Sequence, residues 1–343
     1  MSVFIIAEFG SNFYNGKADY DTAIKGIDAA VEAGADAVKF QTYSSDTLYA
    51  SNTPDFAGYS NINQLIKDIE LPREWQKDLK DYCDSKGIEF MSTPFDEAAI
   101  HQLVDLGVKR LKIAGFEATD PRFVEEVAKT GLPIIMSAGI GFKDQYWGIF
   151  SDIFELYGND VTLLHCNNAY PTPMEDAKLS HISDFPGLKS VNRMGFSDHT
   201  MSTLTPALAV ARGAKVIEKH FTLDRTMEGP DHPFALEPGE LKEMVRLIRE
   251  AEKTLGYKDG LTESEKGFSK AMRSVVSKVD LKAGDVLTAD NITTKRPLLE
   301  DSVPAIDFPY IIGYKIEQDY KADTPISKEA ISSYYEPEEI EHV

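Results

Sequence analysis

The feature that most constrains the fold of this chain is a repeat of short apolar runs, each followed by a longer segment with helical spacing. In the first long segment, Ile24, Ile27 and Val31 form one apolar stripe, and Gly34 follows it as a helix end. The alternation predicts an α/β protein with parallel strands. Eight apolar runs are expected to be strands: residues 3–8, 36–41, 88–93, 110–115, 132–137, 161–166, 193–198 and 215–220.

Eight strand–helix units within residues 1–258 match the (β/α)8, or TIM, barrel in number and length. An open, doubly wound sheet is the alternative, and it usually carries a glycine-rich phosphate loop after its first strand. The segment "EFGSNFYNG" follows the first strand here and lacks the G-x-G-x-x-G spacing. The sequence therefore favours the barrel.

The pattern changes after residue 258. Residues 259–272 are polar and are expected to form a linker, and residues 273–335 contain short alternating runs without a long helical pattern. A short tail, residues 336–343, ends the chain. A β-rich domain of roughly 60 residues is close to the size at which a core alone is marginal. We therefore expect this second domain to be supported by another surface.

Charge and cysteine content narrow the possible functions. The 343 residues include 36 basic and 56 acidic side chains, for a net charge of −20, which disfavours nucleic acid and anionic lipid as partners. The N-terminus lacks the basic region of a signal peptide, and no apolar run approaches a membrane span. Two cysteines do not suggest a disulfide framework. We expect a soluble cytoplasmic protein.

Polar residues gather at the carboxyl ends of the predicted strands. In a barrel these ends meet on one face, where active sites of this fold lie. Each residue alone has an ordinary explanation, since lysines reach water and histidines occur in cores. Together, two lysines and several hydroxyls are typical of an anion site, and two imidazoles of a divalent-metal site. The set comprises Glu8, Lys39, Gln41, Ser92, Thr93, Lys112, Ser137, His165, Asn167, Ser197, His199, Glu218 and His220.

Several motifs resemble one family. "FIIAEFGSN", "EAGADAVKFQT", "HCNNAYPTP", "FSDHT", "IEKHFTLDR" and "TTKRP" occur in this order. In this order and spacing they resemble the sialic acid (N-acetylneuraminate) synthases, and the second domain resembles that family's antifreeze-like (SAF) domain. The resemblance implies an enzyme that condenses phosphoenolpyruvate with an acylamino sugar aldehyde such as N-acetylmannosamine, releasing phosphate by C–O cleavage.

The resemblance also implies roles for individual residues. His199 and His220 would hold a divalent metal, Mn2+ or Mg2+, with Glu8, Glu117 and His220 taking part in catalysis. Phosphoenolpyruvate would be bound by Lys39, Gln41, Thr93, Lys112, Ser137 and Ser197. The sugar would meet Asn168, Tyr170, Asp231 and Arg296. Arg296 would reach from the SAF domain of one subunit into the barrel of its partner, which implies a domain-swapped homodimer.

Two loops depart from the family pattern. Phe13 stands where the first loop usually has a histidine. The fourth strand, which often ends Gly-Ser-Gly-Glu in the family, here continues Ala114, Gly115, Phe116, Glu117, so a phosphate-binding hydroxyl is absent. The second change and "KFQTYSSDTL" resemble the pseudaminic acid synthase branch, whose substrate is a 6-deoxy-diacetamido hexose. Two other classes stay open: a Schiff-base pyruvate lyase using Lys39 or Lys112, and a non-catalytic carbohydrate-binding protein on the same fold.

Overall fold

The computed structural model describes residues 2–55, 61–140, 147–184 and 191–332. The chain forms two compact units, Met1–Leu255 and Gly256–Val343. Within the described residues, no helix combines the length and the apolar character that crossing a membrane would require.

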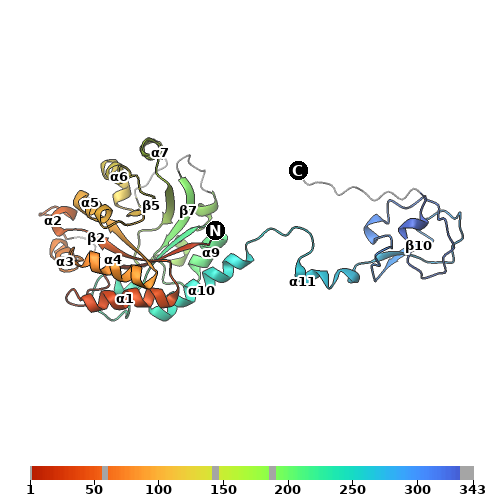
Figure 1. Cartoon of the computed structure of the whole chain (residues 1–343), viewed down its shortest axis with the longest axis horizontal. Coiled ribbons are helices and arrows are strands. Elements are labelled where there is room, and N and C mark those ends of the chain that lie inside the picture. The colour runs from red at the N-terminus through yellow and green to blue at the C-terminus, as the bar shows by residue number, and fades with distance from the viewer. Residues whose placement is uncertain (1, 56–60, 141–146, 185–190, 333–343) are drawn as a thin grey trace. The chain divides into compact units, whose positions relative to one another are not determined.

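Eight parallel strands form the centre of the larger unit (Figure 1). They follow the order β3-β2-β1-β8-β7-β6-β5-β4, and the two end strands also lie beside each other, so the barrel is nearly closed. Each strand overlaps its predicted range, which confirms the predicted fold. The strands are β1 Phe4–Gly10, β2 Ala37–Thr42, β3 Glu89–Pro94, β4 Leu111–Ile113, β5 Ile134–Ala138, β6 Val161–Cys166, β7 Val191–Asp198 and β8 Val216–His220.

Helices surround the strands (Figure 1) and bury their apolar stripes against them. Local signals set their ends: the Asp19 carboxylate caps α1, Gly34 ends it with φ 82°, and Glu237 and Glu240 form a capping box on α10. The helices are α1 Tyr20–Ala33, α2 Ser45–Leu48, α3 Ile62–Asp68, α4 Trp75–Lys86, α5 Glu97–Asp105, α6 Pro121–Ala128, α7 Trp147–Tyr157, α8 Ser180–Asp184, α9 Thr205–Ala211 and α10 Pro238–Thr254.

The inside of the barrel has an apolar layer and a polar layer. Six strands contribute the apolar layer, which consists of Ile6, Ala37, Met91, Ile135, Leu164 and Val216. Side chains alternate along a strand, so the residue two positions later points to the same side. Those next residues are Glu8, Lys39, Thr93, Ser137, Cys166 and Glu218. The period-two pattern thus closes the barrel with hydrophobic packing below and leaves polar side chains at its carboxyl end.

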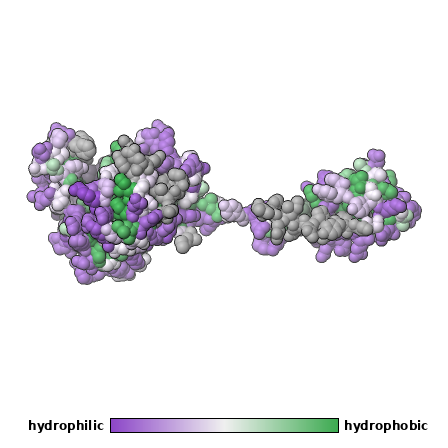
Figure 2. Space-filling model, turned by 90° about the horizontal axis from the view of Figure 1, so that it is seen from above, coloured by the Kyte–Doolittle hydropathy of each residue, from purple (hydrophilic) through white to green (hydrophobic). Residues whose placement is uncertain are grey.

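The smaller unit has its own apolar core around Val275, Leu287 and Ile292. Its described part contains α11 (Glu263–Lys266) and one antiparallel pair, β9 (Ser274–Ser277) and β10 (Ile292–Lys295), extended by isolated bridges. The short helix α11 lies within the segment predicted to be a linker. Hydrophobic residues also reach the surface of this unit (Figure 2), among them Ile306 and Tyr310.

Candidate active site

The carboxyl ends of the barrel strands surround one polar pocket, and ten of the thirteen strand-end residues singled out in the sequence line it. Ser92, His165 and Asn167 do not, and Ser92 and His165 bond Thr42 and the Ala177 carbonyl instead. The cavity between the lining side chains is small, about 50 Å3. Eleven predicted site residues line it: Glu8, Lys39, Gln41, Thr93, Lys112, Ser137, Asn168, Tyr170, Ser197, His199 and His220. They come from all eight strands or from the segments that follow them, so the closure of the barrel creates the site.

Lys39 on β2 lies at the centre of the first half of the pocket. Its Nζ is 2.6 Å from Glu8 Oε2 and donates a 2.9 Å hydrogen bond to Thr93 Oγ1. Gln41 Nε2 donates to the other Glu8 oxygen over 2.8 Å. The Lys39 and Glu8 side chains are 3% and 1% exposed. This pair is therefore shielded from water, and its charges act strongly on anything bound beside it.

Lys112 on β4 lies at the centre of the second half. Its Nζ donates to Ser137 Oγ over 2.8 Å and to the Ile113 carbonyl over 2.9 Å. Glu218 on β8 lies 3.7 Å from both lysine ammonium groups and accepts a 3.2 Å hydrogen bond from Ser197 Oγ. One carboxylate thus neutralises both lysines at longer range, and each ammonium keeps donor capacity for an incoming anion.

The ionisation of these groups follows from burial and charge. Burial raises the pKa of Glu8 to about 7, against the opposing charge of Lys39. Burial also acts to raise the pKa of Glu218, but Lys112 and Lys39 outweigh it and hold that pKa below its usual value. Burial lowers the pKa of Lys112. Glu8 can therefore exchange a proton near neutral pH, whereas Glu218 stays a carboxylate.

His199 and His220 face each other at the pocket edge, with ring centroids 5.4 Å apart. Burial lowers the pKa of both imidazoles, which favours the neutral form that binds metal. His199 Nδ1 donates to the Asn167 carbonyl over 2.6 Å, which leaves Nε2 with its lone pair. His220 Nδ1 is buried and has no hydrogen-bond partner among the described residues.

These features fit a divalent metal held by two imidazoles. Among the described residues, no group of three or more His, Cys, Asp or Glu side chains is arranged to hold an ion. The protein would therefore supply two ligands, and oxygens of substrate or water would supply the others.

The rim of the pocket carries the residues expected to meet the sugar. The Tyr170 ring packs on His199 with centroids 4.3 Å apart, yet 45% of the residue remains exposed. Asn168 Oδ1 accepts a 2.8 Å hydrogen bond from Ile140 N. Asp231 accepts a 3.2 Å hydrogen bond from Ser11 Oγ. The side chains of Asp231, Glu8 and Gln41 all lie against Gly10. An aromatic face, an amide and a carboxylate suit the apolar and hydroxyl surfaces of a sugar.

Two of the predicted site residues, Glu117 and Arg296, belong neither to the lining nor to the rim of this pocket. Glu117 follows β4 in a short 3-10 helix, Glu117–Thr119, and its buried Oε2 has no hydrogen-bond partner among the described residues. Burial raises its pKa. Arg296 follows β10 in the other unit, is exposed, and forms no ion pair with the residues described there. Its predicted role therefore stays a prediction.

The structure adds Cys166 to the pocket lining and shows what surrounds Glu218, which the sequence had placed at the barrel mouth. The sequence placed Glu218 on the same face as His220, but gave it no role, because its two lysine partners belong to distant strands. The structure also explains the departure from the family pattern in the first loop. Phe13 is 1% exposed and packs edge-on against Trp75, so this position serves the core. Phe116, the other departure, is 52% exposed.

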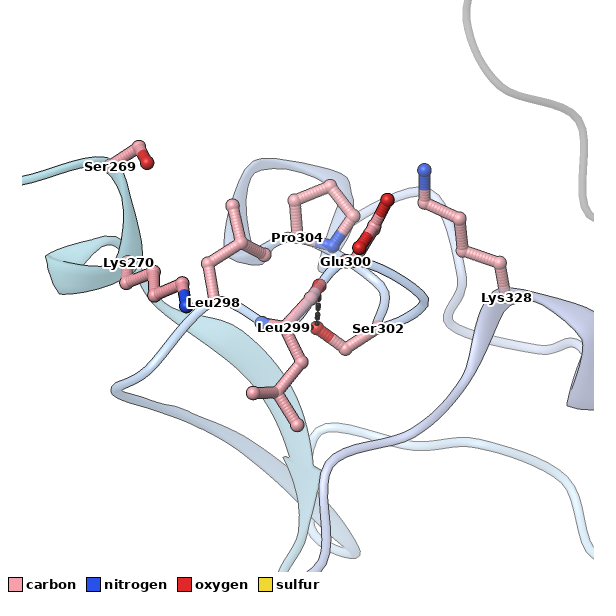
Figure 3. A pocket seen from close by; sticks show the side chains of 8 residues that line it. All are labelled: Ser269, Lys270, Leu298, Leu299, Glu300, Ser302, Pro304 and Lys328. Carbon is pink, nitrogen blue, oxygen red and sulfur yellow. Dashed lines mark hydrogen bonds between the residues drawn. The ribbon is translucent and has the colours of Figure 1, made fainter. Parts of the chain in front are cut away.

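A roomier pocket, of about 260 Å3, lies in the smaller unit (Figure 3). It combines the Leu298 and Leu299 side chains with two lysines, Lys270 and Lys328, and Ser302 donates a hydrogen bond to the Leu299 carbonyl. Its described lining carries no histidine and no cluster of buried charges. The barrel pocket is smaller, but its buried ionisable groups make it the better candidate for chemistry.

The fold and the barrel pocket define a (β/α)8-barrel protein whose mouth brings together two buried lysines and two buried imidazoles. Comparison with known proteins is more specific: residues 26–260 match the NeuB family and residues 272–332 match the SAF domain. The chain belongs to the NeuB family. This result agrees with the resemblance found in the sequence.

Relatives span nearly the whole chain. The N,N'-diacetyllegionaminic acid synthase of Legionella pneumophila is 36% identical over 97% of this chain and 96% of its own length. The pseudaminic acid synthase of Campylobacter jejuni is 37% identical over 86% of this chain and 87% of its own. The crystal structure of the N-acetylneuraminic acid synthetase from Leptospira borgpetersenii, in complex with citrate, is 34% identical. It matches 78% of this chain and 90% of its own, with a TM-score of 0.71.

Proposed function

We propose that this chain is a nonulosonic acid synthase. It condenses phosphoenolpyruvate with N-acetylmannosamine or a close acylamino hexose, giving an N-acetylneuraminate-type 2-keto acid and phosphate. The observation that carries the proposal is the buried arrangement of Lys39 and Lys112 around Glu218, with hydroxyl donors beside each ammonium. In a chain of net charge −20, such a concentration of buried cations has an evident use in holding a highly charged anion.

The reaction needs two bonds made and one broken. Carbon 3 of phosphoenolpyruvate attacks the aldehyde carbon, the new C–C bond forms, and the aldehyde oxygen takes up a proton. Water then adds at carbon 2 and loses one proton, which balances the proton taken up by the aldehyde oxygen. The bond from carbon 2 to the phosphate oxygen breaks, and the remaining proton of the new hydroxyl leaves with the phosphate. Inorganic phosphate leaves, and the 2-keto group forms. The bridging oxygen departs with the phosphate.

The pocket residues match these steps. Lys39 and Lys112, with Thr93, Ser137 and Ser197, hold the phosphate and carboxylate groups. Glu8 carries the moving proton, because its pKa of about 7 lets it hold or release one near neutrality.

At the rim, Tyr170, Asn168 and Asp231 orient the sugar, and Glu117 is proposed to assist there. His199 and His220 would hold Mn2+ or Mg2+, which would polarise the aldehyde as a Lewis acid. Arg296 of the partner subunit is proposed to complete the site in a domain-swapped homodimer.

A 6-deoxy-diacetamido hexose is the second candidate substrate. It is favoured by the Phe116-Glu117 pair after the fourth strand, which resembles the pseudaminic acid synthase branch, and by relatives named as legionaminic and pseudaminic acid synthases.

A panel assay separates the candidates. Purified protein, phosphoenolpyruvate and Mn2+ are mixed with N-acetylmannosamine or with diacetamido hexoses, and phosphate release is followed. We expect release to depend on one sugar and on metal, to stop with chelator, and to carry an 18O label from the bridging position. If none of the sugars in the panel causes phosphate release, a non-catalytic carbohydrate-binding role would be the better explanation.

A Schiff-base lyase is tested separately, because the lowered pKa of Lys112 would suit one. Borohydride added with pyruvate should trap no covalent adduct in the intact mass spectrum. An adduct on Lys112 or Lys39 would contradict the proposed condensation.

A further inference from the structure

Lys219 lies between two pocket residues but points away from the pocket. Glu218 and His220, its neighbours on β8, both line the polar pocket, and the alternation of a strand turns Lys219 to the other side of the sheet. Its side chain is nevertheless only 1% exposed. A lysine ammonium buried outside the substrate pocket needs an explanation, because burial costs free energy unless partners compensate.

The partners of Lys219 belong to the end of β7. Its Nζ donates to Asp198 Oδ2 over 2.8 Å and also donates to the Thr200 carbonyl. The Asp198 side chain is 0% exposed, and its other oxygen accepts from Thr200 N over 2.8 Å. One ammonium group is thereby bound to the residues on both sides of His199.

This arrangement links the two imidazoles. Lys219 precedes His220 in the chain, and its two bonds hold Asp198 and Thr200, which flank His199. The His199 ring is itself fixed by its hydrogen bond to the Asn167 carbonyl. The two rings, 5.4 Å apart between centroids, thus belong to segments that a buried lysine connects across the β7–β8 boundary, in addition to the backbone pairing of the two strands.

We propose that Lys219 is a positioning residue that fixes the separation of His199 and His220 for metal binding. The inference rests on the proposed role of the two imidazoles as metal ligands. A buried ion pair is a poor source of net stability, so an apolar pair would serve a purely structural purpose as well. A metal site, in contrast, depends on groups behind its ligands, whose loss typically lowers metal affinity about 10- to 100-fold.

The test measures Mn2+ affinity directly. The full-length protein is titrated with Mn2+ in the absence of substrates, and the electron paramagnetic resonance signal gives the concentration of free Mn2+. Lys219→Met should raise the Kd for Mn2+ about 10- to 100-fold. Because this change leaves the Asp198 carboxylate buried without its cation, a second variant, Lys219→Met with Asp198→Asn, removes both charges and keeps the side-chain volume. It should show the same loss while keeping a cooperative thermal transition.

The matched control is Arg110→Met. Arg110 bonds Glu89 over 2.7 Å and so also links two neighbouring strands, but at their amino ends, away from the pocket. It should leave Mn2+ affinity unchanged. A folded Lys219 variant that binds Mn2+ as tightly as wild type would overturn the inference alone. Wild-type protein that binds no Mn2+ would overturn the inference together with the proposed metal site.

Discussion

In the barrel the central ion pairs are buried, whereas in the smaller unit the described pairs lie on the surface. Lys39–Glu8 and Lys219–Asp198 have side chains no more than 3% exposed. Lys282–Asp319 and Lys321–Asp280 have side chains more than half exposed. Exposed pairs contribute little because water and salt screen them, while buried pairs must offset a large desolvation cost. Both units have an apolar core, so what distinguishes them is that the barrel also buries charged pairs at its carboxyl end.

The largest expected effect tests whether the smaller unit also contributes a residue to catalysis. If Arg296 completes the site of the partner subunit, His220→Ala and Arg296→Ala should each abolish nearly all activity. Mixing the two inactive variants should restore about a quarter of wild-type activity after random subunit exchange, because half of the dimers then have one intact site.

Native mass spectrometry confirms the exchange in this experiment. Mixed dimers without activity would contradict the shared site. They would leave the barrel chemistry and the contrast between the units intact.

The second prediction compares a buried lysine with an exposed one. Lys112→Ala removes a charge-assisted donor from the anion pocket and should raise the KM for phosphoenolpyruvate about 10- to 100-fold, with a much smaller change in the KM for the sugar. Lys321→Ala removes an exposed cation of the smaller unit and should leave both KM values and the Tm unchanged. Equal effects of Lys112→Ala on both substrates would contradict its assignment to the anion.

The third prediction concerns packing at the rim. A Cβ at Gly139 would lie 1.8 Å from Asn168 Oδ1, so Gly139→Ala must displace the Asn168 carboxamide. We expect the KM for the sugar to rise about 5- to 10-fold, as for one lost hydrogen bond, with little change for phosphoenolpyruvate. In an Asn168→Ala background the same change should add nothing.

The control for this prediction is Gly267→Ala in the smaller unit. Nothing lies within 4 Å of a Cβ built at Gly267. This variant should behave as wild type in both KM values.

The smallest expected effect is a proton taken up on binding. The pKa of Glu8 is raised to about 7, so at about pH 8 most Glu8 is ionised, and phosphoenolpyruvate is fully charged. A bound anion disfavours the carboxylate and raises this pKa further. Titration calorimetry in buffers of different ionisation enthalpy should therefore show uptake of up to about one proton.

Glu8→Gln should reduce this uptake while keeping the side-chain shape. Proton release in wild type would contradict the sign of the expected coupling. Undiminished uptake in Glu8→Gln would assign the proton to another group.

The sequence alone determined the barrel and the inward direction of most pocket residues, because both follow from local patterns. A strand alternates its side chains, so "KVIEKH" fixes which residues share a face wherever that strand lies. The same pattern placed Lys39 and Gln41 together and brought eight polar carboxyl ends to one mouth.

Only the tertiary structure decided which charges compensate each other. Glu218 meets lysines from β2 and β4, and Lys219 meets the residues around His199 on β7. These contacts depend on how the strands are ordered and staggered when the barrel closes, which no single strand specifies. Coulomb interactions act through space, and their strength depends on burial. The roles of Glu218 and Lys219 therefore depend on neighbours that are distant in the sequence and that only the folded barrel brings together.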